Sequence, residues 1–117
     1  MMSSFELTKS KTLDISIVIP VYNERENLIL LDKKITKSIK PLNKEYEVIL
    51  VDDGSVDGSV ELIRKLKNKN PCLRLIRFDR NYGQTAAFAA GFSKARGNII
   101  VTMDADLQND PADIPLL

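Results

Sequence analysis

The sequence predicts an α/β fold, in which a mostly parallel sheet carries helices on both faces. Short runs rich in β-branched residues alternate with segments that have helical periodicity. The runs are almost continuously apolar, as is typical of strands that are covered on both faces. An order of strand, helix, strand, repeated through the chain, implies parallel strands joined by right-handed crossovers.

The first half of the chain predicts two strands and the helix between them. Residues 15–21 are a first apolar strand. A helix is expected from about residue 26 to residue 40, because leucine and isoleucine recur there on one stripe, and Pro41 ends it. Residues 47–51 form the second strand.

The second half continues the alternation. A helix is expected over residues 58–68, ended by Asn70-Pro71, and a third strand over residues 73–78 with one face less buried. Residues 84–95 predict a helix whose small residues suit close packing on the sheet. A fourth strand, residues 99–103, leads directly into Asp104-Ala105-Asp106.

Composition limits the kinds of protein this can be. The 117 residues suffice for one domain, and a net charge of +1 gives no reason to expect nucleic-acid binding. Histidine is absent, which excludes histidine bases and ligands, and Cys72 has no partner for a disulfide. Residues 1–13 are expected to be a polar N-terminal extension. No run has the length of a signal peptide core or a membrane span. Because Cys72 is the only cysteine, a reducing, cytoplasmic location is expected.

Polar residues follow each predicted strand and point to one site. In parallel sheets, ligands bind beyond the carboxyl ends of the strands, where the strand order reverses. The four clusters are Tyr22-Asn23-Glu24, Asp52-Asp53-Gly54-Ser55, residues 79–84, and Asp104 to Asn109. The connections at the opposite edge lack paired acids. We therefore expect the four clusters to line one crevice.

Asp104 and Asp106 are the most informative of these residues. They emerge together from the end of a buried strand, and two carboxylates at this spacing can share one hard divalent cation with substrate phosphates. The alternative is a pair of turn-forming or helix-capping aspartates. The other three clusters favour the cation site.

Four motifs in order resemble one known family. They are residues 17–24 (IVIPVYNE), residues 51–58 (VDDGSVDG), residues 80–84 (RNYGQ) and residues 103–108 (MDADLQ). Together they look like the inverting family 2 glycosyltransferases with a GT-A fold. Within that family the match is closest to polyprenyl-phosphate glycosyltransferases, of the dolichyl-phosphate mannose synthase and undecaprenyl-phosphate sugar transferase type. The resemblance covers residues 14 to about 115.

The resemblance implies a Rossmann-like nucleotide-sugar-binding half domain over residues 14–117. Tyr22 offers a ring suited to a nucleobase, Asp52 is expected to accept a hydrogen bond from a base N–H, and Asp57 is expected to be structural, at the start of the second helix. The residues expected to bind the nucleotide sugar are Pro20, Tyr22, Asn23, Glu24, Asp52, Asp53, Gly83, Gln84, Asp104, Ala105 and Asp106.

The resemblance also implies the metal site and the reaction. Asp106 is the main expected ligand, Asp104 is shared between metal and ribose, and Gln108 is a third metal-facing position. Mg²⁺ or Mn²⁺ suits this set of oxygen ligands. The implied reaction is direct displacement at the anomeric carbon of a nucleotide sugar, with UDP expected rather than GDP and a polyprenyl phosphate as acceptor.

The chain stops at Leu117, where family members continue for about as long again. The general base and acceptor surface are therefore expected beyond Leu117, and the full-length protein is expected at the cytoplasmic face of a membrane, in the synthesis of cell-envelope glycans. The 117 residues alone are expected to be inactive. They are also expected to self-associate, because the outer edge of the fourth strand would be unpaired.

Three alternatives stay open from the sequence. The chain can bind a nucleotide sugar without transferring it, or belong to a family 2 transferase that acts on a polysaccharide or another soluble acceptor. A nucleotidyltransferase also uses paired acids on an α/β sheet. It is disfavoured, because the first strand-to-helix connection here, residues 22–26, has no glycine.

Overall fold

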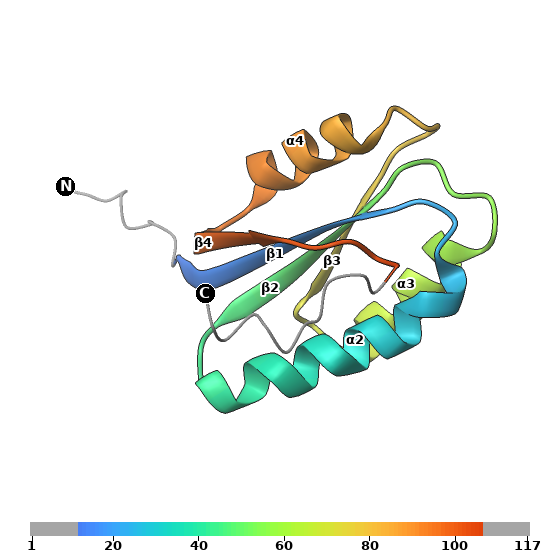
Figure 1. The fold of residues 1–117 in the computed structure, drawn as a ribbon. Helices are drawn as coiled ribbons and strands as arrows, with labels where there is room; N and C mark the ends of the chain where they lie inside the picture. The colour runs from blue at the N-terminus through green and yellow to red at the C-terminus, as the bar shows by residue number, and fades with distance from the viewer. Residues whose placement is uncertain (1–11, 107–117) are drawn as a thin grey trace.

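A computed structural model describes residues 12–106 as a four-stranded parallel sheet (Figure 1). The strands are β1 (Leu13–Val21), β2 (Tyr46–Asp52), β3 (Leu73–Arg77) and β4 (Gly97–Thr102), in the order β3-β2-β1-β4. Strands β1 to β3 follow one another in one direction, and β4 then returns to the free side of β1. The order therefore reverses between β1 and β4, and the predicted α/β fold is confirmed.

The helices lie on both faces of the sheet. Helices α2 (Arg25–Ile39) and α3 (Ser59–Lys69) cover one face, and α4 (Gln84–Lys94) covers the other (Figure 1). Helix α2 ends one residue earlier than predicted and continues as a short 3₁₀ turn, η1 (Lys40–Leu42). Pro41 fits this turn because proline, which has no N–H, is tolerated at the start of a helix. The fourth strand begins at Gly97, two residues before the prediction.

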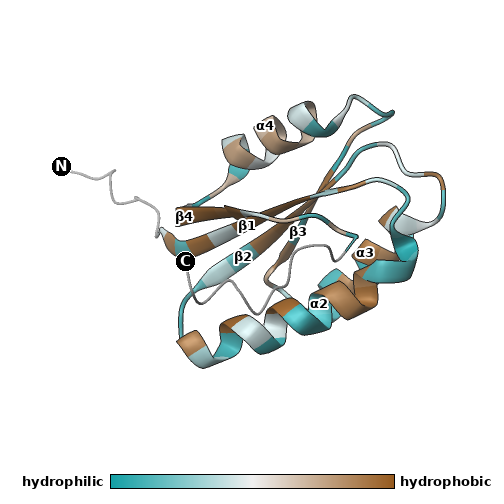
Figure 2. Ribbon diagram, in the orientation of Figure 1, coloured by the Kyte–Doolittle hydropathy of each residue, from teal (hydrophilic) through white to brown (hydrophobic). Residues whose placement is uncertain are grey.

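Two apolar layers hold the helices to the sheet (Figure 2). The larger joins α2 and α3 to the sheet through side chains such as Leu31, Ile35 and Ile63. The smaller, under α4, contains Val18 and Ala87. A Cβ on Gly91 would lie 2.3 Å from Val18 Cγ1, so α4 approaches β1 more closely than a larger residue would allow.

Strand β4 is an edge strand within the described residues. Ile99 is 56% exposed and Ile100 is 43% exposed, although both belong to an apolar run. Exposed edge strands are templates for pairing with another chain. The expected self-association stays a prediction. None of the helices within residues 12–106 has the length and apolar character needed to cross a bilayer.

A buried carboxylate joins the strands at their amino ends. Glu47 on β2 is 2% exposed and accepts hydrogen bonds from Ser16 Oγ on β1 over 2.6 Å and from the Arg96 backbone N–H over 2.7 Å. The Arg74 guanidinium on β3 and the Arg96 side chain complete its surroundings. One side chain thus connects β1, β2, β3 and the segment that leads into β4.

Burial alone would raise the pKa of Glu47. The hydrogen bonds from Ser16 and the Arg96 backbone N–H, together with the Arg74 guanidinium, outweigh burial and lower the pKa below its usual 4.5. A carboxylate whose pKa is lowered on folding stabilises the folded state above its unfolded pKa. That stabilisation is lost as the pH falls through the folded pKa.

We expect Glu47→Gln to lower the free energy of unfolding by about 2–3 kcal/mol at pH 7, because it weakens several charge-assisted hydrogen bonds in a buried position. Urea unfolding followed by circular dichroism measures the change. The deficit should shrink as the pH falls from 4.5 toward the lower pKa of folded Glu47, because the unfolded carboxylate takes up its proton first and the stabilisation is lost over this range. Glu61→Gln, on the exposed side of α3, is the control and should stay within about 0.5 kcal/mol. An equal loss in both variants would contradict the role given to Glu47.

Candidate functional site

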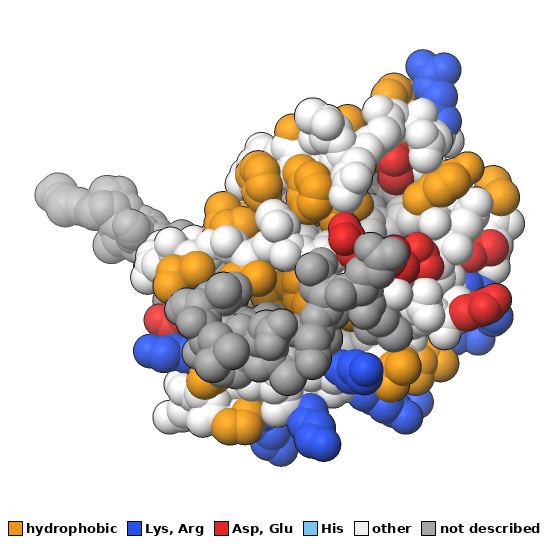
Figure 3. Space-filling model, in the orientation of Figure 1, with side chains coloured by type: hydrophobic (Ala, Val, Ile, Leu, Met, Phe, Trp, Pro, Cys, Tyr) orange, Lys and Arg blue, Asp and Glu red, His pale blue; other side chains and the backbone are white. Residues whose placement is uncertain are grey.

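A cavity of about 530 Å³ lies at the carboxyl edge of the sheet, where the strand order reverses between β1 and β4. Figure 3 shows acidic side chains gathered on this side of the molecule. The residues that line the cavity are Pro20, Val21, Tyr22, Glu24, Asp53, Asn81, Gly83, Gln84, Asp104, Ala105 and Asp106. The structure thus brings parts of all four predicted polar clusters to one place.

The Asp104-Ala105-Asp106 segment forms one wall. It directly follows β4, and Ala105 is only 2% exposed, so the segment is fixed to the core between its two acids. From the opposite side, Gln84 at the start of α4 directs its Nε2 toward Asp104 Oδ1 over 3.4 Å. Helix α4 and the end of β4 therefore face each other across the cavity.

Asp53 lines the cavity but is also occupied by backbone donors. Tyr82 N–H donates to Asp53 Oδ1 over 2.7 Å, and Gly83 N–H donates to Oδ2 over 3.0 Å. The Asn81 side chain donates to the Asp53 carbonyl over 3.2 Å. Asp53 thus holds the turn that leads into α4. The two backbone N–H groups also offset part of the negative charge of the Asp53 carboxylate.

Two glycines make this arrangement possible. Gly54 has φ +82°, and a Cβ there would lie 2.5 Å from the Arg80 carbonyl carbon, so the turn before α4 packs directly on the Gly54 backbone. Gly83 has φ +101°, with open space around it. A glycine is favoured at position 83 by this backbone angle and not by steric crowding. Gly83 directly precedes α4 and lines the cavity.

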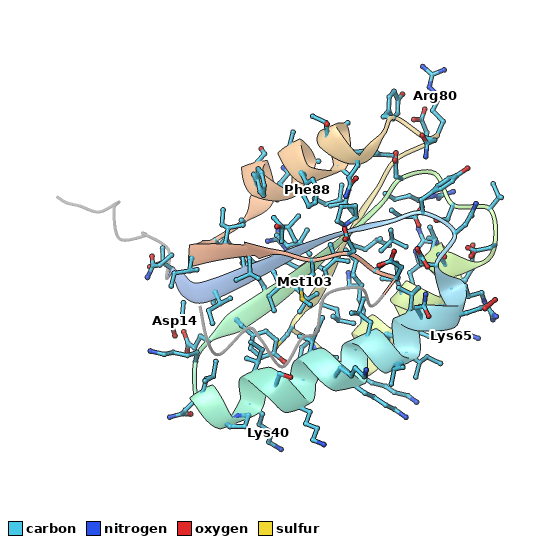
Figure 4. The ribbon with its side chains drawn as sticks, viewed as in Figure 1. Asp14, Lys40, Lys65, Arg80, Phe88 and Met103 are labelled. Atoms are coloured by element: carbon cyan, nitrogen blue, oxygen red, sulfur yellow. The ribbon has the colours of Figure 1, made fainter. Side chains whose placement is uncertain are left out.

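Aromatic contacts hold the same turn from outside. Tyr82 packs edge-on against Phe78, with ring centroids 5.6 Å apart. The Arg80 guanidinium lies 5.2 Å from the centre of the Tyr82 ring and donates to its hydroxyl. Figure 4 shows Arg80 projecting from the tip of this turn, away from the sheet. Tyr82 therefore contacts both Phe78 and Arg80, and these contacts stabilise the turn.

Asn23 does not line the cavity, although it was expected among the binding residues. Its backbone lies in the left-handed region, φ +53°, which asparagine tolerates better than most residues. Its N–H donates to Ser55 Oγ over 2.8 Å, and its Oδ1 accepts from Val56 N–H over 2.9 Å. Asn23 thus ties the loop after β1 to the loop after β2.

Asp57 joins the starts of α2 and α3. Its Oδ1 accepts from Ser59 N–H over 3.0 Å, and its Oδ2 accepts from Arg25 N–H over 3.1 Å. Burial opposes the charged form, but the hydrogen bonds from the Ser59 hydroxyl and from the Arg25 and Ser59 N–H groups together lower the pKa of Asp57. Asp57 does not line the cavity, and the contacts agree with the structural role expected for it.

Asp52, the last residue of β2, is buried and does not line the cavity. It is 1% exposed, and its Oδ2 accepts from Ser55 N–H over 2.9 Å. Its Oδ1 has no hydrogen-bond partner within residues 12–106. A buried carboxylate oxygen without a donor is costly, so this atom needs a donor from a ligand or a water molecule.

Sequence reasoning did not single out two of the cavity residues. Val21 is a fully buried strand residue, and nothing in an apolar run marks which residue ends beside a cavity. Asn81 lies inside the RNYGQ motif, and its polar side chain in that motif could have indicated that it lines the site. Gln108, the third expected metal-facing residue, lies outside the described residues.

The donor set suits a hard divalent cation. Four acidic residues line the cavity (Glu24, Asp53, Asp104 and Asp106), and they would repel a diphosphate unless a cation lay between them. Within the described part of the chain, no three Asp, Glu, Cys or His side chains converge on one point. Protein carboxylates would therefore share the ion with substrate oxygens and water, as is usual for Mg²⁺.

Comparison with known proteins gives a consistent result. The model of the glycosyl transferase family 2 domain matches residues 16–117. An undecaprenyl-phosphate 4-deoxy-4-formamido-L-arabinose transferase from Proteus mirabilis is 48% identical over 118 residues, 99% of this chain and 35% of that protein. The transferase of the same name from Aeromonas hydrophila is 50% identical over 104 residues, 88% of this chain and 32% of that protein. The chain thus spans about a third of these relatives.

Solved structures extend the similarity to the fold. The mannosyltransferase PcManGT from Pyrobaculum calidifontis, in complex with GDP-Man and Mn²⁺, has a TM-score of 0.66 at 26% identity over 83% of this chain and 28% of that one. The S. aureus protein TarS 1-349, in complex with UDP, has a TM-score of 0.70 at 26% identity over 80% of this chain and 27% of that one. The GT-A fold implied by the resemblance is confirmed.

The contacts of Asp53 lead to a direct test. We expect Asp53→Ala to expose the Tyr82 and Gly83 amides, because it removes the carboxylate that accepts both N–H groups. Amide hydrogen exchange should be at least about tenfold faster at these two positions, while amides in β1 keep their protection.

Asp79→Ala is the matched control, since Asp79 is an exposed acid in the same turn. It should leave the exchange of both amides unchanged. Equal acceleration by the two substitutions would mean that the turn is held by other contacts.

Proposed function

The chain belongs to glycosyl transferase family 2, and we propose that residues 14–117 are the donor-binding part of an inverting transferase. The proposed donor is a nucleotide diphosphate sugar, and the proposed acceptor is a polyprenyl phosphate. The names of the two curated relatives favour undecaprenyl phosphate as the acceptor and 4-deoxy-4-formamido-L-arabinose as the sugar. The reaction belongs to the whole protein, of which relatives are about three times as long as this chain.

One observation carries the proposal. The cavity at the reversal of the strand order combines Asp104 and Asp106 with the start of α4 and with Tyr22. This combination offers oxygen ligands for a cation, backbone N–H groups for a phosphate and a ring for a base. A nucleotide diphosphate needs all three.

Asp104 and Asp106 are the described residues that would hold Mg²⁺ or Mn²⁺, with Gln108 as the further expected ligand. When bound, the ion would neutralise the negative charge of the departing diphosphate. The Mn²⁺ in the complex of PcManGT supports a divalent ion in this type of fold. Asp53 is less suited as a ligand, because both of its oxygens already accept backbone N–H groups.

The other cavity residues would hold the nucleotide. Tyr22 is 49% exposed at the end of β1, where its ring is available to a base. The unpartnered Oδ1 of Asp52 would accept the base N–H, either directly after a small shift of the loop or through water. Gly83 and Gln84, at the start of α4, would face the diphosphate.

Uridine is the proposed base. A uracil ring presents one N–H between two carbonyl groups and so matches a single carboxylate oxygen that needs one donor. Of the similar solved structures, TarS 1-349 is in complex with UDP and PcManGT is in complex with GDP-Man. The structural comparisons include both bases, so the choice is settled by titration.

We expect the chain to bind UDP at least about tenfold more tightly with Mn²⁺ or Mg²⁺ than with a chelator, because the cation offsets repulsion between the diphosphate and the cavity acids. Isothermal titration calorimetry with UDP and GDP measures this. Equal affinity with and without metal would contradict the metal site, and a preference for GDP would contradict the choice of uridine.

Three aspartate variants separate the roles. Asp106→Ala should remove the metal-dependent part of the affinity, and Asp52→Ala should weaken UDP binding whether or not metal is present. Asp57→Ala is the control: it should keep the affinity for UDP while losing about 1 kcal/mol of stability at the start of α3. A loss of binding by Asp57→Ala at unchanged stability would contradict this division.

A further inference from the structure

The basic side chains are concentrated on one part of the molecule. Residues 32–44, on α2, η1 and the two residues after it, and residues 61–69, on α3, contain nine of the 17 Lys and Arg residues but only two of the 16 Asp and Glu residues. All nine basic residues are exposed. In a chain with a net charge of +1, positive charge is therefore strongly separated from the acidic cavity at the sheet edge.

A groove runs through this basic region. It has a volume of about 530 Å³ and is lined by Asp32, Lys33, Thr36, Lys37, Lys40, Lys69 and Asn70. Its single carboxylate, Asp32, accepts a hydrogen bond from Asn70 Nδ2 over 2.9 Å. Figure 4 shows Lys40 and Lys65 directed away from the sheet, and Figure 3 shows Lys and Arg side chains along this side of the molecule. The groove therefore offers four ammonium groups to an anionic partner.

Two exposed aliphatic side chains continue the same helix face. Ile29 is 47% exposed and Leu30 is 46% exposed, both on the outward side of α2. Ile29, Lys33 and Lys37 follow one another at intervals of four residues and so lie on one stripe. This outward stripe carries apolar side chains on its early turns and lysines on its later turns.

We propose that the basic groove and the outward stripe of α2 dock on an anionic lipid surface. Lysines attract the headgroups of anionic lipids, and exposed aliphatic side chains gain by entering the boundary with the acyl chains. Nucleic acid is a poorer match, because residues 29–44 and 61–69 contain no aromatic residue for stacking and only one arginine, Arg64. The choice of a lipid also rests on the proposed function, whose acceptor is a lipid phosphate.

This docking keeps the cavity accessible. Helix α2 begins at Arg25, directly after the cavity residue Glu24, and Lys37 lies roughly 18 Å further along the helix. A membrane against the outward side of α2 would therefore lie beside the cavity rather than across its mouth. A lipid-borne acceptor would reach the sheet edge from the side.

Vesicle co-sedimentation tests the proposal without nucleotide or polyprenyl phosphate. We expect the chain to bind vesicles of phosphatidylcholine and phosphatidylglycerol and not vesicles of phosphatidylcholine alone. Binding should weaken between 50 and 300 mM salt, because the attraction is electrostatic. No binding to anionic vesicles, equal binding to both kinds, or tighter binding to a single-stranded RNA than to anionic vesicles would each overturn the proposal.

Matched variants locate the surface. Lys33→Gln with Lys37→Gln should weaken binding to anionic vesicles at least about fivefold, since each basic group near an anionic surface contributes substantially. Arg77→Gln with Lys94→Gln removes the same charge from exposed positions elsewhere and should change binding less than about twofold. Equal losses in the two double variants would overturn the assignment of this surface.

The contribution of Ile29 and Leu30 to vesicle binding is tested separately. Ile29→Ser with Leu30→Ser should weaken binding, whereas Val56→Ser, at a residue that is 87% exposed in the loop between β2 and α3, should not. If Ile29→Ser with Leu30→Ser bound as well as wild type, docking by this stripe would be overturned. Unchanged melting temperatures verify the folding of each variant. UDP titration of the same proteins is a separate readout, so failure to bind vesicles is distinguishable from failure of the nucleotide site.

Discussion

The position of β4 beside β1 depends on a buried carboxylate at the opposite end of the sheet. Glu47 accepts hydrogen bonds from Ser16 Oγ and from the Arg96 N–H, and Ser16 Oγ in turn accepts from the Gly97 N–H over 2.7 Å. These bonds fix the first residues of β4 against β1. A Cβ on Gly97 would lie 2.4 Å from the Ser16 nitrogen, so the fit is also steric. Because β4 is short, fixing its start determines where Asp104 and Asp106 emerge. A buried charge is costly unless its partners are in place, which makes this register specific.

The acidic residues at the other end of the sheet divide into two groups by what they already contact. Asp53 and Asp57 accept backbone N–H groups from other loops and so hold the site together. Asp52 retains one buried oxygen without a partner among the described residues. Asp53 and Asp57 thus hold loops together through backbone donors, whereas the oxygen of Asp52 that lacks such a donor is the one we propose for the base N–H.

The strands, the helices and the meeting of the four polar clusters could be predicted from the sequence, because periodicity and parallel topology determine which ends of the strands lie together. Glu47 could not be singled out. Its partners Ser16, Arg74 and Arg96 are 27 to 49 residues away, and a glutamate at the start of a strand is usually exposed. The different positions of Asp52 and Asp53 were also beyond sequence reasoning. Asp53 is held by N–H groups of the turn before α4, and the sequence does not show that this turn packs on the Gly54 backbone.

The separation of charge affects how such a chain would approach a lipid surface. With a net charge of +1, the molecule as a whole is only weakly attracted to an anionic membrane. When the molecule lies within about 8 Å of the membrane, the Debye length at physiological salt, the anionic lipids attract its basic groove and repel its acidic cavity. The lysines on α2 are drawn to the surface while Asp104 and Asp106 are repelled, so the field turns the molecule until α2 faces the membrane. A cation bound between the two aspartates would reduce the repulsion at the cavity. Loading of the donor site would then allow the sheet edge to come closer to a lipid-borne acceptor.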